Sequence, residues 1–135
     1  MGRKLWNEVS EHGDRGIGRV RDRCEPGNRA AFTRALLARG AAKVYAGVRC
    51  PEDFDEPGAE AVRLDVTDPD QIAAAATTAS DATVVINNAG IQAGPPLLEG
   101  SLGGARKELG VNYLGTWAVS RAFAPSLPRT AAEPW

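Results

Sequence analysis

The sequence has little of what most metal, redox and nucleic-acid sites require. Its 135 residues include one histidine and two cysteines, and 16 basic residues nearly balance 17 acidic ones. That balance excludes the cationic excess of a nucleic-acid-binding surface or a polybasic membrane patch. The single histidine, His12, gives no support to a metal site. Two cysteines, Cys24 and Cys50, are too few for a disulfide framework, so we expect both to be reduced thiols.

Long hydrophobic runs are missing as well. No run of about 18 apolar residues occurs and no secretory leader follows Met1, so the sequence predicts a soluble, cytoplasmic protein. A chain of 135 residues suits one domain. Residues 1–29 show no sustained apolar period, so their sequence predicts no clear secondary structure. Residues 30–135, by contrast, have the hydrophobic patterning of a folded unit.

Short stretches rich in valine and leucine predict a sheet. They span 42–48, 60–65 and 82–87, and each is bounded by glycine, proline or acidic turns. An earlier stretch, KLWNEVSE at 4–11, would be the first strand in chain order. It is too polar for the centre of a sheet, so the sequence makes that strand doubtful.

Helical periods alternate with these strands. The stretch 30–39 has apolar residues at helical spacing and stops at Gly40, which tolerates a positive φ. Asp68 is placed to cap a second helix, with Gln71 completing a capping box. A long helix is predicted over about 101–124. Strands that alternate with helices indicate an α/β fold with a parallel sheet.

The run VVINNAG, residues 84–90, ends an apolar strand in two amides and two very small residues. In an open parallel sheet, ligands bind beyond the carboxyl ends of the strands, so these residues would form the floor of a site. The amides of Asn87 and Asn88 can pair neighbouring backbone groups, while Ala89 and Gly90 let a flat ligand approach the backbone. The alternative is a plain Asn-rich turn.

Four motifs follow one another at the strand ends and on the next helix. They are VYAGVR at 44–49, LDVTD at 64–68, NNAG at 87–90 and VNYLGTWAVSRAF at 111–123. Together, over roughly residues 30–127, they resemble the short-chain dehydrogenase/reductase family. The resemblance implies a Rossmann-like, doubly wound parallel sheet. It also implies an NAD(P)-dependent oxidoreductase that transfers hydride between its cofactor and a small carbonyl or alcohol substrate.

The resemblance implies roles in binding adenosine. Asn88, Ala89 and Gly90 match the stretch that stabilises the central sheet and lines the adenosine ribose. Asp65, with Val66 behind it, matches the acid that receives the adenine amino group. A carboxylate can accept that N–H without a countercharge. The alternative for Asp65 is a helix cap or a solvated loop acid.

Arg49 matches the position at which the family places a basic residue for the 2′-phosphate of NADP. Cofactors without that phosphate usually meet Asp or Glu there, because a carboxylate binds the ribose hydroxyls and repels phosphate. The resemblance therefore favours NADP over NAD. The alternative is a surface arginine, because Cys50 and Pro51 follow it instead of a second basic group.

Asn112 lies in the long predicted helix, on a stripe that should face inward. The stripe also contains Leu109, Thr116, Val119 and Phe123. A buried amide needs a partner, and a backbone group would suffice. In the family the matching asparagine holds a water in the proton relay, which makes Asn112 the one catalytic residue that the resemblance implies.

The family's glycine-rich loop, which holds the cofactor pyrophosphate, is matched only in part. HGDRGIG offers Gly13, Gly16 and Gly18 as cofactor-binding residues, with the first gap one residue short. Residues 1–29 are thus interpreted as a segment with remnants of that loop. Residues 30–135 are interpreted as a partial NAD(P)-binding Rossmann domain.

The family's proton donor and its partner, a Tyr-x-x-x-Lys pair, do not occur in the sequence. The family's later, serine-bearing strands are missing too, so we expect an incomplete sheet. One hypothesis is the dinucleotide-binding half of an NADP-dependent oxidoreductase. The alternative is a non-catalytic nucleotide-binding fragment, or the product of a damaged or mispredicted gene. We expect no nucleic-acid or membrane partner, and a homo-oligomer only for a complete chain.

Overall fold

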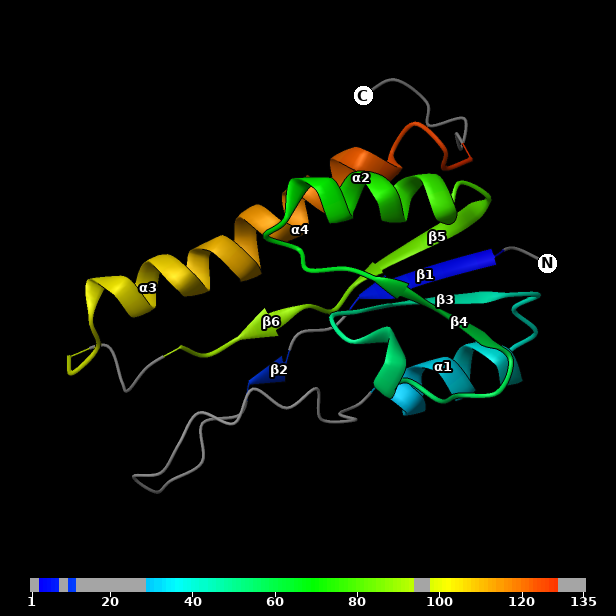
Figure 1. The fold of residues 1–135 in the computed structure, drawn as a ribbon, viewed down its shortest axis with the longest axis horizontal. Coiled ribbons are helices and arrows are strands. Elements are labelled where there is room, and N and C mark those ends of the chain that lie inside the picture. The colour runs from blue at the N-terminus through cyan, green and yellow to red at the C-terminus, as the bar shows by residue number, and fades with distance from the viewer. Residues whose placement is uncertain (1–2, 8–9, 12–28, 94–97, 129–135) are drawn as a thin grey trace, which may run out of the picture.

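The computed structural model describes residues 3–7, 10–11, 29–93 and 98–128 of the chain. Its centre is a four-stranded sheet in the order β4-β3-β1-β5, formed by β1 (Arg3–Asn7), β3 (Val44–Val48), β4 (Ala59–Arg63) and β5 (Ala82–Asn87). The short strands β2 (Ser10–Glu11) and β6 (Gly90–Ile91) pair in parallel with each other. Helices cover both faces of the sheet (Figure 1), so the predicted doubly wound α/β class is confirmed.

Strand β1 occupies the centre of the sheet, although the sequence makes a strand there doubtful. It pairs in parallel with β3 on one side and β5 on the other, so that Leu5 lies opposite both Tyr45 and Val85. A polar sequence can form this strand because backbone groups, not side chains, make the ladder. The other three strands lie parallel, as predicted. Strand β5 forms one edge of this sheet, with Val84 40% exposed.

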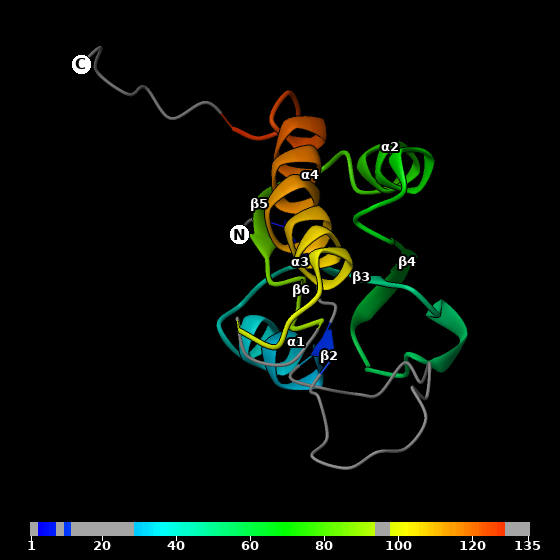
Figure 2. The same cartoon turned by 90° about the vertical axis from the view of Figure 1, so that its left-hand side faces the viewer.

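The two faces of the sheet carry separate hydrophobic cores. In β3, which is buried throughout, Val44, Ala46 and Val48 pack with Leu36 of α1 (Arg29–Ala38). Tyr45 belongs to the other core, because successive residues of a strand point to opposite faces. That second core also contains Leu64, Ile72, Val119 and Phe123. Figures 1 and 2 show α1 on one side of the sheet, and α2 with α4 on the other.

Helix α2 (Pro69–Thr78) begins at the predicted cap. Asp68 Oδ1 accepts from the backbone N–H groups of Asp70 and Gln71 at 2.9 and 3.2 Å. The pKa of the Asp68 carboxyl lies below its usual value, and the largest cause is the hydrogen bond from the Gln71 backbone N–H. Gln71 Nε2 donates to Asp68 Oδ2, while its Oε1 accepts from the Asp65 N–H at 2.9 Å instead of from the cap residue. The cap therefore also fixes the loop after β4.

The predicted long helix is continuous but changes its winding. It runs from α3 (Leu102–Glu108) through a π-helical segment (Leu109–Gly115) into α4 (Thr116–Phe123). Its buried positions are Val111, Gly115, Val119 and Phe123. These positions are four residues apart, and four residues of an α-helix rotate about 40° beyond one full turn. A wider π turn has more residues per turn, so it compensates for this extra rotation. No helix among the described residues is long and apolar enough to span a membrane.

The π-helical segment makes part of the predicted inward stripe wrong. Leu109 is 55% exposed and Asn112 is also exposed, whereas Val119 and Phe123 are buried as expected. A regular 3.6-residue period does not apply across a π turn. The buried face therefore passes through Val111 instead of Asn112.

Gly115 lies close against Val66, in the loop that follows β4. A Cβ at this position would lie 2.6 Å from Val66 Cγ2 and 3.1 Å from the Val66 carbonyl oxygen. Because a backbone atom contributes to the clash, a rotamer change of Val66 would not relieve it. At Gly110, in the same π-helical segment, an added Cβ would meet nothing within 4 Å.

We predict that Gly115→Ala destabilises the protein by about 1–3 kcal/mol, because the added methyl overpacks the contact with Val66. Gly110→Ala is the matched control and should be neutral or stabilising, since alanine favours helix over glycine by about 1 kcal/mol. Urea unfolding of both variants measures the difference. Equal stability of the two variants would show that the helix can move away from Val66 without cost.

Candidate functional site

The carboxyl ends of three parallel strands bring the predicted cofactor residues to one edge of the sheet. Arg49 follows β3, Asp65 and Val66 come after β4, and residues 88–90 follow β5. Parallel neighbours end on the same side, so these residues share a region although they are far apart in sequence. The predicted pyrophosphate residues lie outside the described part of the chain: Gly13, Gly16 and Gly18.

The carboxylate of Asp65 is held in one orientation. Its Oδ1 accepts from the backbone N–H of Thr67 at 2.9 Å and from the Thr67 hydroxyl at 2.6 Å. Within the described residues, no hydrogen bond to Oδ2 is present. Asp65 is half-buried, and the next residue, Val66, is buried against Gly115. The arrangement leaves a fixed acceptor oxygen for an external N–H donor.

The strand after the NNAG motif is held on two sides. Strand β6 pairs with β2, and Asn112 contacts its residue Ile91. Asn112 Oδ1 accepts from the Ile91 N–H at 2.8 Å, and Asn112 Nδ2 donates to the Ile91 carbonyl at 2.9 Å. One side-chain amide thus satisfies both backbone groups, as a residue of a neighbouring strand would. Asn112 thus has the backbone partner that was the alternative to a role in the proton relay.

Glu108 is a site residue that sequence reasoning missed. Its Oε1 accepts from the Ala93 N–H at 2.6 Å. Ile91 and Ala93 are two residues apart in an extended segment, and Asn112 and Glu108 are four apart in a helix. Both spacings are about 6 to 7 Å, so the two side chains can hold alternate backbone groups of one strand. The sequence signal for Glu108 was its spacing of four residues from Asn112 on the helix that follows the NNAG motif.

The amide of Asn87 also finds a partner, but on a helix instead of a loop. Its Nδ2 donates to Ser120 Oγ at 2.9 Å, which ties the end of β5 to α4. Ser120 follows Val119 of the buried face by one residue. The interpretation of the two asparagines as bridges to neighbouring backbone therefore does not apply to this contact of Asn87.

Arg49 lies in a loop that is held by an arginine of the next strand. Arg63, the last residue of β4, donates from Nη1 to the Arg49 carbonyl at 2.8 Å and from Nη2 to Glu52 Oε2 at 3.0 Å. The sequence shows no second basic group directly after Arg49. The fold supplies one from β4, because Arg63 is in register with Val48 on the adjacent strand.

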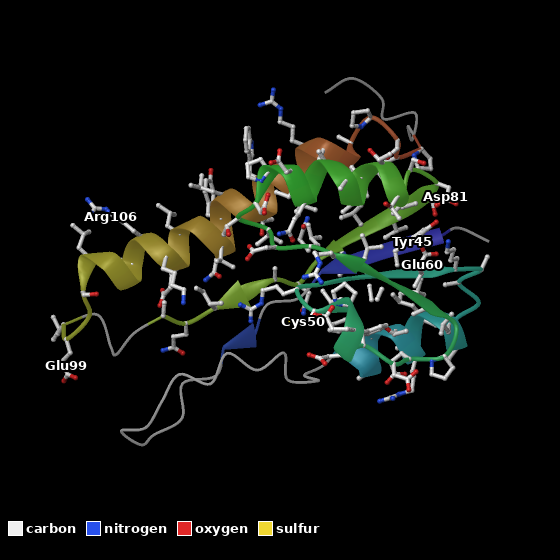
Figure 3. The ribbon with its side chains drawn as sticks, viewed as in Figure 1. Tyr45, Cys50, Glu60, Asp81, Glu99 and Arg106 are labelled. Carbon is white, nitrogen blue, oxygen red and sulfur yellow. The ribbon has the colours of Figure 1, made fainter. Side chains whose placement is uncertain are left out.

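Cys50 is disulfide-bonded, so the prediction of a reduced thiol at this position is wrong. The other cysteine of the chain, Cys24, lies outside the described residues. Figure 3 shows Cys50 at the carboxyl edge of the sheet, whereas Tyr45 and Glu60 lie toward the opposite edge. A count of cysteines does not reveal which side chains folding brings within bonding distance.

An open groove of about 620 Å³ runs between α2 and α4. It begins at Val66 and Thr67 and is mostly apolar along its length, with Leu114 and Trp117 among its lining residues. The guanidinium of Arg121 lies 5.2 Å from the Trp117 ring centroid. No group of three or more metal-binding side chains is found in the described residues. The polar side chains in the groove lining are those of Thr67 and Arg121.

Comparison with known proteins gives the family. The sequence profile described as short chain dehydrogenase matches residues 13–132. The chain belongs to this family. Family membership agrees with the resemblance of the four motifs and with the parallel order of the strands.

Relatives in the short-chain dehydrogenase family are longer than this chain. A short-chain dehydrogenase/reductase of Pestalotiopsis microspora is 29% identical over 107 residues, which are 77% of this chain and 40% of that protein. A short-chain dehydrogenase of Burkholderia cenocepacia, solved in complex with NADP, is 35% identical, with a TM-score of 0.71 over 93% of this chain and 48% of that one. NADPH-bound carbonyl reductase from chicken fatty liver shares the fold at 24% identity, with a TM-score of 0.66 over 93% and 50%. The chain spans half of these relatives or less.

We predict that Asn112→Ala loosens β6 in this short-chain dehydrogenase chain. Losing two hydrogen bonds to Ile91 should cost about 1–3 kcal/mol of unfolding free energy and speed hydrogen exchange at the Ile91 amide. Asn112→Asp should not restore the strand, because a carboxylate cannot donate to the Ile91 carbonyl. The exposed neighbour Gln92 provides the control variant, Gln92→Ala. Unchanged exchange at Ile91 in Asn112→Ala would contradict the prediction.

Proposed function

We propose that the chain is the dinucleotide-binding half of an NAD(P)-dependent oxidoreductase that transfers hydride between its cofactor and a carbonyl or alcohol. The observation that carries the proposal is the convergence of Arg49, Asp65 and residues 88–90 on one carboxyl edge. Residues far apart in sequence, each suited to one part of a dinucleotide, meet where open α/β sheets bind ligands. Membership of the short-chain dehydrogenase family supports the same conclusion.

Each residue has a distinct part in the proposed cofactor site. Asp65, held through Oδ1, would accept the adenine amino group at Oδ2. Residues 88–90 would line the adenosine ribose. Arg49 would bind the 2′-phosphate, which makes NADP the proposed cofactor. The NADP complex of the Burkholderia cenocepacia relative, at 35% identity, supports that choice. The bound cofactor would supply or receive the hydride.

The proposed role of Asn112 is to hold a water near the reacting group. Each polar atom of its side chain makes one hydrogen bond to Ile91, which leaves one donor hydrogen and one lone pair for a water. The same bonds prevent the amide from rotating, so a water bound there would have a fixed position.

The second candidate function is a non-catalytic nucleotide-binding chain. It is favoured by the absence of any Tyr-x-x-x-Lys pair from the 135 residues, since that pair supplies the proton donor of the family. Both candidates share the cofactor site, and catalysis distinguishes them.

The first test of the proposed function is nucleotide preference. We predict that the chain binds NADP more tightly than NAD and that Arg49→Ala removes most of the difference. One charge-assisted phosphate contact contributes about 1.5–3 kcal/mol, or roughly ten- to a hundredfold in affinity. Calorimetric titration with both nucleotides measures the effect. The control is Arg39→Ala, which removes an exposed arginine after α1. Equal affinity for both nucleotides in the unmutated chain would reject the role of Arg49.

The second test is catalysis. We predict that the 135-residue chain does not transfer hydride at the rate of a full-length relative, because a positioned proton donor contributes about 10² to 10⁴ in rate. NADPH absorbance with a panel of ketones, aldehydes and quinones measures turnover. A full-length member of the family is the control. Turnover equal to that of the control would reject the non-catalytic candidate and show that another residue donates the proton.

A further inference from the structure

We infer that Arg63 and Glu52 set the strength of the NADP preference, with Arg63 as a positioning and screening residue beside Arg49. The inference rests on the proposed function, because it concerns the same 2′-phosphate. It adds two residues, on a different strand and in a different loop, that the sequence motifs do not single out. Arg63 would act through the backbone and the charge around Arg49, not as the main phosphate ligand.

Two contacts connect Arg63 with the Arg49 loop. Its Nη1 donates to the Arg49 carbonyl at 2.8 Å, and its Nη2 lies 3.0 Å from Glu52 Oε2. The first contact fixes the peptide from which the Arg49 side chain departs. The second turns the carboxylate of Glu52 toward a cation. The planar fork of arginine can hold both acceptors at once, which a lysine ammonium does less rigidly.

The charge of this loop explains why such screening matters. After Arg49, the chain carries Glu52, Asp53 and Asp55, all exposed. Carboxylates near a phosphate repel it, and this repulsion is the means by which NAD-specific sites exclude NADP. Without Arg63, Glu52 would keep its full charge close to Arg49. The ion pair with Arg63 therefore reduces a repulsion that would otherwise oppose the 2′-phosphate.

The ion pair between Arg63 and Glu52 contributes little to the stability of the fold. Its side chains are 56% and 63% exposed, and exposed pairs contribute little to stability. Removing either charge should therefore leave the fold intact while changing the local potential. A second Arg–Glu pair, Arg34 with Glu56 at 2.9 Å, joins α1 to the turn before β4, with side chains 65% and 16% exposed. It provides a control pair of the same two residue types outside the Arg49 loop.

The experiment compares NADP with NAD on the 135-residue chain. Calorimetric titrations are made on Arg63→Gln, Glu52→Gln, the double variant, and the controls Arg34→Gln and Glu56→Gln. We expect Arg63→Gln to lower the ratio of NADP to NAD affinity by about tenfold and Glu52→Gln to raise it by about threefold. The double variant should recover most of the loss, because the unscreened carboxylate is gone. The controls should change the ratio by less than about twofold, and the unfolding curves of the Arg63 and Glu52 variants should match that of the unmutated chain.

The outcomes separate the inference from the function on which it rests. No binding of either nucleotide by the unmutated chain would reject the proposed function and the inference together. An NADP preference that depends on Arg49 but not on Arg63 or Glu52 would overturn the inference alone. Equal losses for NADP and NAD in Arg63→Gln would also overturn it, because a merely structural residue would weaken both nucleotides. Failure of Glu52→Gln to rescue Arg63→Gln would show that Arg63 does not act by screening.

Discussion

Parallel pairing around β1 is the constraint on which the rest of the structure depends. Because β3 and β5 both run parallel to this strand, all the strands of the sheet end at the same edge. Arg49, Asp65 and residues 88–90 meet there only for that reason. The ladder is made of backbone groups, so a polar sequence at β1 suffices. Every proposed cofactor contact of the described residues follows from this shared direction.

The long helix contacts the segments that follow β4 and β5 and holds them in place. Its π-helical segment keeps residues four apart on one buried face, which lets Gly115 contact Val66 without a side chain between them. The same winding places Asn112 over Ile91, while Glu108, one turn earlier, reaches Ala93. Two polar side chains on one helix thus pair the backbone after the NNAG motif. A site floor that contains small residues is held rigid by groups outside it.

The loop after β3 combines opposite charges within a few residues. Arg49 would favour a phosphate, the acidic residues that follow would disfavour it, and Arg63 contacts the loop from the adjacent strand. We propose that cofactor choice at this loop depends on how these charges pair, not on one residue. The disulfide at Cys50 adds a covalent restraint directly after Arg49. Arg63, which contacts the loop, is 14 residues away in sequence.

The sequence by itself determined strands β3 and β5, the Asp68 cap and the end of α1 just before Gly40, because these depend on local patterns and backbone preferences. Its motifs also indicated the family and the sheet edge at which we propose that the cofactor binds. Only the tertiary structure decided that a polar β1 fills the centre, that Leu109 turns outward, that Glu108 contacts Ala93 and that Arg63 contacts the Arg49 loop. Those outcomes depend on backbone pairing, on a π turn and on contacts between distant segments. Backbone pairing and a π turn have no local sequence period, and of the contacts between distant segments only that of Glu108 had a sequence signal, its four-residue spacing from Asn112.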